Sequence, residues 1–396
     1  MKLSPALSRS LLVVLALVVV AWLAMGLLLE RFVNRVEPVP LPSVSPRAQA
    51  IHGTSFVADL HADSLLFGRD LLERSEVGHV DLRRLQEGGV ALQVFSLPTV
   101  APAGQNIEKN ESGGFDLITL AGIVQLSPTA FLGPTGRSLL RAEQLHTYAR
   151  ESNGELMMIL DRGDLEGLQA ARAEGADITG ALLAIEGAHA LESDPENLKR
   201  LFDAGYRMIG LTHFFDNDYA GSAHGVTRDG LTELGRQTVR EMERLGITLD
   251  LAHLAPKAVD EVLDLATRPV VFSHGGVRGT CDNQRNLSDA HVRRVAENGG
   301  VVGIGYWDWA VCGTRPEDIA KAIAYVVRLV GADHVGFGSD YDGGTTVGFD
   351  TSHLAVLTQA MLDEGLSESQ VRRALGDNIL RVLTANLPPA GIAHAN

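Results

Sequence analysis

Cysteine is almost absent from this 396-residue chain, which contains only Cys281 and Cys312. Two cysteines are too few for a disulfide-stapled scaffold and too few for a zinc site built from thiolates. The sequence leaves two states open, since they could pair with each other or remain two separate structural cysteines. Any metal site in this chain would therefore use His, Asp and Glu side chains.

Positive charge is also scarce. The chain has 49 Asp and Glu residues against 34 Lys and Arg, a net charge of −15, and no block rich in Lys or Arg. Nucleic-acid-binding proteins place clustered basic residues against phosphates, so we expect no nucleic-acid partner. No GxGxxG turn follows an early apolar run, which argues against a doubly wound dinucleotide-binding sheet.

The N-terminus contains one long apolar run, residues 11–29, with no charged side chain. As a helix it would be ~28 Å long, close to the ~30 Å hydrocarbon thickness of a bilayer. Lys2 and Arg9 precede the run, whereas the charges after it cancel. We therefore expect a cytoplasmic N-terminus (1–10), a transmembrane anchor or uncleaved signal (11–29), and a catalytic domain in the periplasm or on the outer face of the cytoplasmic membrane. A signal peptide cut near residues 24–26 is the alternative.

The segment after the apolar run is rich in proline, with four between residues 36 and 46. We expect residues 30–50 to form an extended linker between membrane and domain. The C-terminal tail, residues 387–396, has no hydrophobic segment, which excludes a GPI signal at that end.

Short apolar runs alternate with amphipathic stretches from residue 51 to residue 386. The runs end at Asp59, Leu97, Leu160, Ile185, Thr212, Leu251, Ser273, Gly305 and Ser339. This alternation predicts βαβ units and a parallel sheet. Eight or nine units predict an α/β fold of the (β/α)8 TIM-like barrel type, and residues 98–116 should form a long loop over its ligand-binding face.

Potential metal ligands close several of these runs. His61 and Asp63 close one, Glu186 another, and His253 and His274 two later ones. The carboxyl ends of barrel strands meet at one face, so these side chains should lie together. Imidazole nitrogens and carboxylate oxygens suit zinc-like divalent ions. Five ligands predict a two-metal centre bridged by a carboxylate and a water or hydroxide. Asp340, which follows a later run, is a candidate acid/base group.

These segments together resemble the signatures of a known family. DLHAD, AIEGAH, IGLTHF, LDLAHL, VFSHGG, RNLSD and HVGFGSDYDG are similar, in order and spacing, to the motifs of the membrane (renal-type) dipeptidases, which belong to the metal-dependent, amidohydrolase-like hydrolase superfamily. The resemblance covers residues 51–386. It implies a zinc dipeptidase that hydrolyses the peptide bond of a dipeptide through a metal-bridging hydroxide. Dimers are common in the family, so a homodimer is a further expectation.

The resemblance also implies a ligand set. His61 and Asp63 would bind the first zinc ion, His253 and His274 the second, and Glu186 would bridge the two.

Three further roles are implied by the resemblance. His213 would stabilise the oxyanion, Asp340 would carry the proton from water to the leaving amine, and Arg285 would bind the substrate carboxylate. Judged from the residues alone, His213 could instead be a third nitrogen ligand. Judged from the residues alone, Arg285 would be assigned to a surface salt bridge. In the role that the resemblance implies, its planar guanidinium suits a carboxylate and would select substrates with a free C-terminus.

Other titratable residues are given structural roles. Asp250 should lie on the opposite side of its strand or support a ligand from behind. His189, three residues after Glu186, is interpreted as structural. The remaining histidines do not close an apolar run and are predicted to be ordinary surface or loop residues: His52, His79, His146, His224, His291, His334 and His353.

Two other functions are compatible with parts of this pattern. An amidohydrolase acting on N-acyl amino acids or cyclic amides would use nearly the same ligands but would not need Arg285 in its RNLSD context. An inactive membrane-tethered binding protein would be expected to lack a ligand or the base, and the sequence retains all of them.

Overall fold

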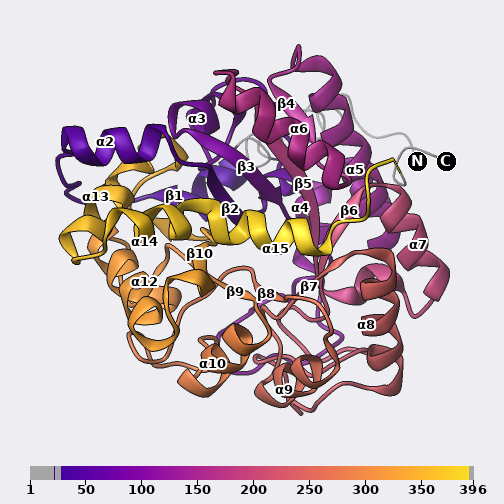
Figure 1. Cartoon of the computed structure of the whole chain (residues 1–396). Coiled ribbons are helices and arrows are strands. Elements are labelled where there is room, and N and C mark those ends of the chain that lie inside the picture. The colour runs from indigo at the N-terminus through magenta and orange to yellow at the C-terminus, as the bar shows by residue number, and fades with distance from the viewer. Residues whose placement is uncertain (1–21, 23–27, 392–396) are drawn as a thin grey trace, which may run out of the picture.

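The structure, a computed structural model, describes Trp22 and residues 28–391. Its centre is a nine-stranded parallel sheet in the order β3-β2-β10-β9-β8-β7-β6-β5-β4 (Figure 1). The strands are β2 (Val57–Ala62), β3 (Val90–Phe95), β4 (Leu156–Met158), β5 (Thr179–Glu186), β6 (Tyr206–Gly210), β7 (Thr248–Asp250), β8 (Val271–Phe272), β9 (Val301–Ile304) and β10 (Val335–Phe337). Because β3 also pairs with β5, eight strands close into a barrel, and β4 pairs with the start of β5. The predicted TIM-like barrel is confirmed, and each predicted run corresponds to one of these strands.

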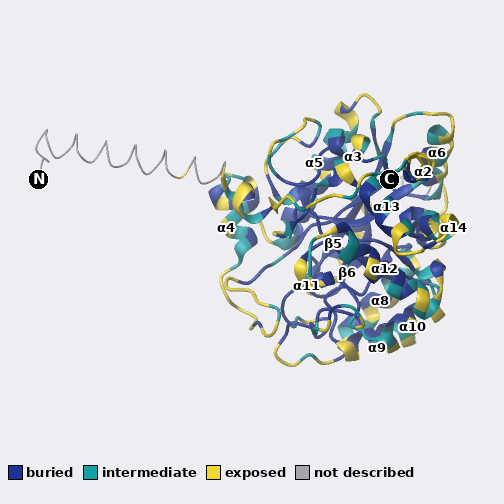
Figure 2. Cartoon of the chain, turned by 90° about the vertical axis from the view of Figure 1, so that its left-hand side faces the viewer, coloured by how far each residue is buried: buried dark blue, intermediate teal, exposed yellow. Residues whose placement is uncertain are grey.

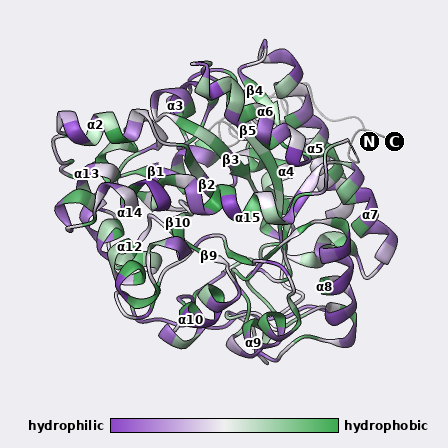
Figure 3. Cartoon of the chain, in the orientation of Figure 1, coloured by the Kyte–Doolittle hydropathy of each residue, from purple (hydrophilic) through white to green (hydrophobic). Residues whose placement is uncertain are grey.

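Helices surround the barrel (Figure 1). They are α2 (Pro46–Gly53), α3 (Leu82–Glu87), α4 (Leu117–Val124), α5 (Pro134–Glu151), α6 (Arg162–Ala173), α7 (Pro195–Asp203), α8 (Glu233–Leu245), α9 (Pro256–Leu265), α10 (Asp289–Glu297), α11 (Asp308–Val311), α12 (Pro316–Val330), α13 (Ala355–Asp363), α14 (Glu368–Arg372) and α15 (Asn378–Asn386). Helix α8 is typical. Val239 and Met242 are buried against the core, and the outer side of the helix is largely hydrophilic, drawn in purple in Figure 3. Such amphipathic crossovers cover a parallel sheet with apolar side chains.

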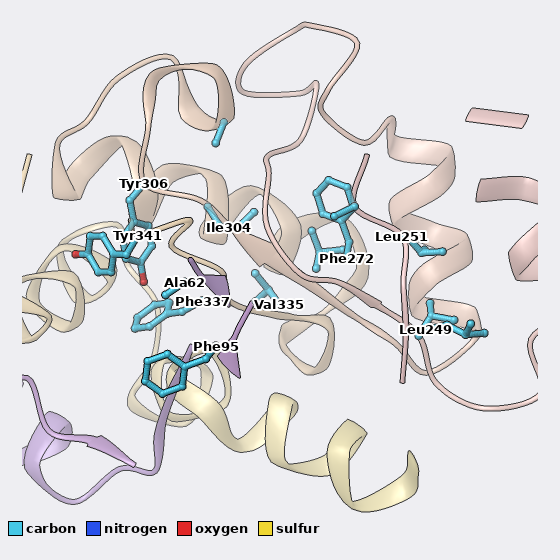
Figure 4. Packing of buried hydrophobic residues seen from close by; sticks show 14 of the residues in the cluster. Ala62, Phe95, Leu249, Leu251, Phe272, Ile304, Tyr306, Val335, Phe337 and Tyr341 are labelled. Atoms are coloured by element: carbon cyan, nitrogen blue, oxygen red, sulfur yellow. The ribbon is translucent and has the colours of Figure 1, made fainter. Parts of the chain in front are cut away.

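The core lies between strands and helices and continues to the ends of the strands. Every residue of β2, β3 and β5 is buried, as expected for strands covered on both faces. At the end of β9 the ring of Tyr306 packs edge-on against Phe337 and Tyr341, with ring centroids 5.9 and 5.4 Å apart (Figure 4). This packing fixes the segment that follows β10, which carries Asp340.

Helix α15 closes the amino-terminal end of the barrel. Its residues Ile379, Val382 and Leu383 belong to one buried cluster with Ala58 of β2 and Val301 of β9. In Figure 1 this helix crosses the middle of the barrel. The carboxyl ends of the strands, at the opposite end, are left to form a site.

The segment predicted as a linker lies against the barrel. Strand β1 (Arg35–Val36) pairs in parallel with β11 (Thr346–Val347), and α2 begins at Pro46 with Ser45 as its N-cap. Glu30 is buried and forms an ion pair with Arg69 at 2.6 Å. Pro38, Pro40 and Pro42 therefore lie between two docked elements, because β1 ends at Val36 and α2 begins at Pro46.

The predicted transmembrane anchor, residues 11–29, lies outside the described residues except for Trp22, Leu28 and Leu29. Among the described residues, no helix has the length and apolar character needed to cross a membrane.

The two cysteines pair. Cys281 and Cys312 form a disulfide that joins the loop after β8 to the end of α11. The side chain of Asn286 donates hydrogen bonds to the backbone carbonyls of Cys281 and Ala310, at 2.8 and 3.0 Å. The disulfide and Asn286 thus fix the loop that carries Arg285 on both sides. The sequence had left the state of the two cysteines open.

Candidate active site

The carboxyl ends of the barrel strands bring the predicted ligands together. His61 is the penultimate residue of β2, and Asp63 directly follows that strand. Glu186 is the last residue of β5, and His253 and His274 follow β7 and β8. All five are buried. Their meeting follows from the barrel, because each parallel strand delivers its last residues to the same rim.

Glu186 is the centre of the cluster. Its Oε1 atom lies 2.7 Å from Nε2 of His253 and 3.1 Å from Nε2 of His274, and its Oε2 atom lies 3.3 Å from Nε2 of His213. One carboxylate therefore faces three imidazoles, with a different oxygen toward His213 than toward the other two.

A second group surrounds His61. Its Nε2 atom lies 3.4 Å from Oδ1 of Asp63 and 3.9 Å from Oδ1 of Asp340. Asp340 was predicted only as an acid/base group, yet its position beside His61 and Asp63 also makes it a candidate metal ligand. The strand-end pattern did point to this residue but could not separate these two roles.

The donor atoms fit metal ions. Three buried sets have all their ligand atoms within 4.8 Å of one another: His61, Glu186 and His274; Glu186, His213 and His253; His61, Asp63 and Asp340. Within the described chain, Nε2 of His61, Oδ1 of Asp63 and Oε1 of Glu186 are buried without a hydrogen bond. Buried polar atoms left unpaired are costly, and divalent cations held by these sets would pair with them.

Burial and neighbouring charges shift the pKa values of the clustered histidines in opposite directions. Burial alone would lower the pKa of His61, but the carboxylates of Asp63, Glu186 and Asp340 raise it to about 10. Burial lowers the pKa of His253 and of His274 well below the usual range, and the positive charge of Arg285 adds to both shifts. His253 and His274 are thus held neutral, which is the form of imidazole that binds a metal.

Buried acids orient the ligands from behind. Ser273 donates to Oδ2 of Asp250 at 2.5 Å, and its Oγ lies 2.8 Å from Nδ1 of His274. This contact leaves Nε2 of His274 facing Glu186. Asp250 therefore supports a ligand, one of its two predicted positions. A matching pair that sequence reasoning missed joins β2 to β10, where Ser339 donates to Asp59 at 2.5 Å.

Arg285 lies beside the cluster with one nitrogen free of protein partners. Its Nη2 atom donates to the carbonyl of His274 at 2.8 Å, and its guanidinium lies over the Phe272 ring, 5.3 Å from the centroid. Its Nη1 atom is buried and makes no hydrogen bond to the described residues. The side chain is thus held by one nitrogen and presents the other to an anion.

A single cavity of about 590 Å³ joins these groups. Its polar wall contains Asp63, Glu186, His213, His253, His274, Arg285 and Asp340. Its apolar wall comes from α4, through Leu117, Leu120 and Val124, and from the N-terminal segment, through Leu29 and Val33. Pro98, Ala101 and Gln105 also line it, so the loop predicted over the ligand-binding face lies there.

Two ligand-bearing turns have unusual backbone. His253 and Asp340 have φ values of 64° and 58°, in the left-handed region that side chains rarely adopt. Such residues concentrate at functional sites, where the surrounding structure holds them in place.

Three histidines predicted as ordinary surface or loop residues are buried instead. His224 stacks on Phe214, with ring centroids 4.9 Å apart, and lines the cavity. His79 is fully buried beside Asp342, and His52 is buried between α3 and α13 through contacts with Gly88 and Thr358. The prediction was wrong for His52, which lies buried in α2. His79 and His224 do lie in loops, but tertiary contacts bury them, so they are not ordinary surface residues.

His189 packs against Phe215, with ring centroids 4.7 Å apart, and burial lowers its pKa to about 4. These contacts agree with its interpretation as a structural residue.

Comparison with known proteins agrees with this geometry. The chain matches the family model described as membrane dipeptidase (peptidase family M19) over residues 45–387. It is 28% identical over 316 residues to the dipeptidase tcpJ of Claviceps purpurea, in a match covering 77% of this chain and 69% of that protein.

Two solved structures share the fold. The metallopeptidase of Rhodobacter sphaeroides, solved with a phosphinate mimic of L-Ala-D-Ala, is 25% identical with a TM-score of 0.67, over 84% of this chain and 99% of that chain. Dipeptidase AC, a metallopeptidase of family M19, is 25% identical with a TM-score of 0.68 and the same coverage. The family match spans most of the chain and every predicted site residue, so the chain belongs to the membrane dipeptidase family, peptidase family M19, and is a hydrolase of the metallopeptidase class.

Proposed function

We propose that the protein is a zinc-dependent dipeptidase whose two ions are bridged by Glu186. The observation that carries the proposal is that the Glu186 cluster and the free nitrogen of Arg285 line one cavity. His61 and Asp63 would hold the first ion with Glu186, and His253 and His274 would hold the second. Imidazole and carboxylate donors without thiolates are typical of catalytic zinc sites.

Arg285 selects the substrate class in this proposal. Its buried Nη1 atom would bind the C-terminal carboxylate of a dipeptide while the scissile bond lies at the Glu186 cluster. A tripeptide would place that carboxylate one residue further away, beyond the reach of a guanidinium held to the carbonyl of His274. A free carboxylate one residue beyond the scissile bond is therefore the expected specificity.

When bound, the ions would polarise the scissile carbonyl and lower the pKa of the attacking water. His213 would donate a hydrogen bond to the developing oxyanion. Its Nδ1 atom is held by the carbonyl of Val100 at 2.9 Å, so Nε2 is the atom that faces the cluster. The ring can donate from Nε2 when it is protonated, whereas a neutral ring would present a lone pair and act as a ligand. Asp340, on the cavity wall beside His61, would carry the proton to the leaving amine.

The place of the enzyme in the cell is also part of the proposal. We infer a membrane anchor at residues 11–29 and a catalytic domain outside the cytoplasm. The length and apolar character of that run support the anchor. The Cys281–Cys312 disulfide supports an oxidising compartment, because cytoplasmic reductants keep cysteine pairs reduced. The homodimer stays a prediction.

The test uses the full chain purified in detergent and loaded with zinc. Hydrolysis of L,L and L,D dipeptides is compared with hydrolysis of tripeptides, N-acyl amino acids and cyclic amides. We expect dipeptide turnover that a chelator abolishes and zinc restores. Equal cleavage of tripeptides, or turnover confined to N-acyl amino acids or cyclic amides, would contradict the proposal and favour an amidohydrolase.

A further inference from the structure

The exposed apolar side chains of the described chain are concentrated on one part of its surface. Of the fourteen large hydrophobic residues that are exposed, five lie in residues 22–41 and six in residues 115–132. The most exposed are Phe131 at 91% and Phe32 at 71%. Clustering of this kind differs from the single exposed apolar residues that are normal on soluble surfaces.

These two stretches are neighbours in space. Leu29 and Val33 from the first stretch line the same cavity as Leu117, Leu120 and Val124 of α4. Leu120 both lines the cavity and is 39% exposed, so it stands at the cavity opening. We call residues 28–32 together with residues 115–132 the apolar rim.

The rim is fixed to the barrel. The amide of Glu37 donates to the carbonyl of Val347 at 2.9 Å, and the side chain of Asn34 accepts from the amide of Gly344 at 2.8 Å. On the other stretch, Arg137 forms an ion pair with Asp116, the N-cap of α4, at 2.7 Å. The apolar residues are therefore presented on a rigid frame.

The composition of the rim resembles a surface that contacts lipid. Residues 117–132 contain no Asp, Glu, Lys or Arg. In α4 Ile118 and Val124 are buried, whereas Leu120 and Ile123 are exposed. A helix that is apolar all round needs an apolar partner on its outer face too. Figure 2 shows α4 at the margin of the molecule, with exposed residues in this region.

The position of the apolar run of residues 11–29 indicates that the rim faces a membrane. The charge-free run of residues 11–29 is long enough to cross a bilayer and ends at Leu29, on the wall that α4 shares. If the run spans the membrane, α4 lies where the chain leaves it. Arg31, within the rim, and Arg35, just after it, are both exposed and would lie at headgroup level.

We propose that the apolar rim inserts into the outer surface of the lipid bilayer, so that the active-site cavity opens against the membrane. This inference rests on the proposed membrane location. Its consequence for function is that substrate enters from the membrane interface, past Leu29, Val33 and Leu120. Dipeptides with apolar side chains would be concentrated at that entrance.

The test places a fluorescent label on single added cysteines. The two native cysteines are paired, so an added cysteine is the free thiol that reacts. Labels are placed through Phe131→Cys and Ile123→Cys on the rim, Trp22→Cys in the apolar run, and Ser369→Cys on α14, across the molecule from α4 (Figure 2). Each full-length chain is reconstituted into phosphatidylcholine vesicles with and without bromine on the acyl chains, which quenches fluorescence on contact.

We expect labels at positions 131, 123 and 22 to lose roughly half of their emission in brominated vesicles, and the label at 369 to keep it. Quenching at position 22 without quenching at 131 and 123 would overturn the inference and leave the anchor intact. No quenching at position 22 would overturn the membrane location and the inference with it, while dipeptide hydrolysis is scored separately.

A second variant separates lipid from a second copy of the chain. Leu126→Asp combined with Phe131→Asp, on exposed positions, should abolish quenching of the label at 123 and leave hydrolysis of a water-soluble dipeptide in detergent unchanged. A second copy of the chain would instead shift the emission of the label at 123 to shorter wavelength as protein concentration rises, with no quenching by brominated lipid. That result would overturn the lipid assignment in favour of a dimer.

Discussion

Glu186 and His253 lie 2.7 Å apart, Oε1 to Nε2, although they come from strands β5 and β7 with β6 between them. The contact reaches past the intervening strand β6, so it depends on the curvature of the sheet in the barrel. It places a carboxylate oxygen against an imidazole whose pKa is held low by burial and by the charge of Arg285. A neutral imidazole beside a carboxylate is an arrangement suited to a cation.

Glu186→Gln is expected to reduce bound zinc to at most one ion per chain and to lower dipeptide turnover by about 100-fold or more. The amide keeps the size of the side chain but loses the charge that faces His213, His253 and His274. Metal content is measured by atomic emission after dialysis. Glu174→Gln, on the exposed end of α6, serves as the control and should keep both ions. A Gln variant with full metal content would show that Glu186 is not the bridge.

Arg285→Lys is expected to lower kcat/KM for dipeptides by roughly 10- to 100-fold, because a lysine cannot hold the His274 carbonyl and a carboxylate in one plane. The loss should fall mainly on KM, with zinc content unchanged. Dipeptide amides, which lack the carboxylate, should be poor substrates for the wild type and no worse for the variant. Arg293→Lys, on the outer face of α10, is the matched control. An equal loss on amides and free dipeptides would contradict the carboxylate clamp.

Asp340→Asn is expected to lower kcat by roughly 100- to 10,000-fold, the range typical of general acid/base groups. Zinc content then separates the two roles that the structure allows. A chain that keeps two ions identifies Asp340 as a proton carrier, whereas a chain that loses one identifies it as a ligand as well. An Asn variant with normal turnover would rule out both.

The docking of the N-terminal segment should depend on pH. Burial raises the pKa of Glu30 from 4.5 to about 7, against the opposing charge of Arg69. Arg69 also pairs with Asp342, so one guanidinium serves two carboxylates, and Arg84 is the other cation that faces Glu30. Between pH 4.5 and about 7 the docked segment holds a proton that the free segment has lost.

Docking is therefore strongest below pH 4.5 and weakens as pH rises to about 7, after which it levels off. Hydrogen exchange at the amides of Arg35 and Glu37, corrected for intrinsic rates, reports the docking equilibrium through their bonds to Thr345 and Val347. Protection should fall from pH 5 to pH 8 in the wild type. In Glu30→Gln, which does not titrate, it should stay level. Protection that rises with pH in the wild type would contradict this assignment.

Much of the barrel could be predicted because its strands are short, apolar and closed by polar residues. His61, Glu186, His253 and His274 each follow an apolar run, and parallel strands bring their carboxyl ends to one rim. The meeting of distant residues was thus encoded in local pattern. The position of β4 outside the barrel could not be predicted, because the apolar run of β4 looks like the others. Only the pairing of β3 with β5 leaves β4 out of the closed barrel.

The rest depends on contacts that local pattern does not reveal. His224 and His79 are buried by loops from elsewhere in the chain, and no apolar run marks them. The linker prolines suggested an extended spacer, whereas the preceding residues pair with β11, more than 300 residues away. The hydroxyls of Ser273 and Ser339 each bond a buried aspartate and also contact a ligand histidine, His274 or His61. Serine at a strand end is too common for the sequence to single these two out.

The most direct test of the account is anomalous diffraction from crystals of the zinc-loaded full chain with a phosphinate dipeptide mimic. The account predicts two zinc peaks that share Glu186 as a ligand, with the carboxylate of the mimic on Nη1 of Arg285. A single peak, peaks that do not share Glu186, or a carboxylate bound away from Arg285 would contradict it.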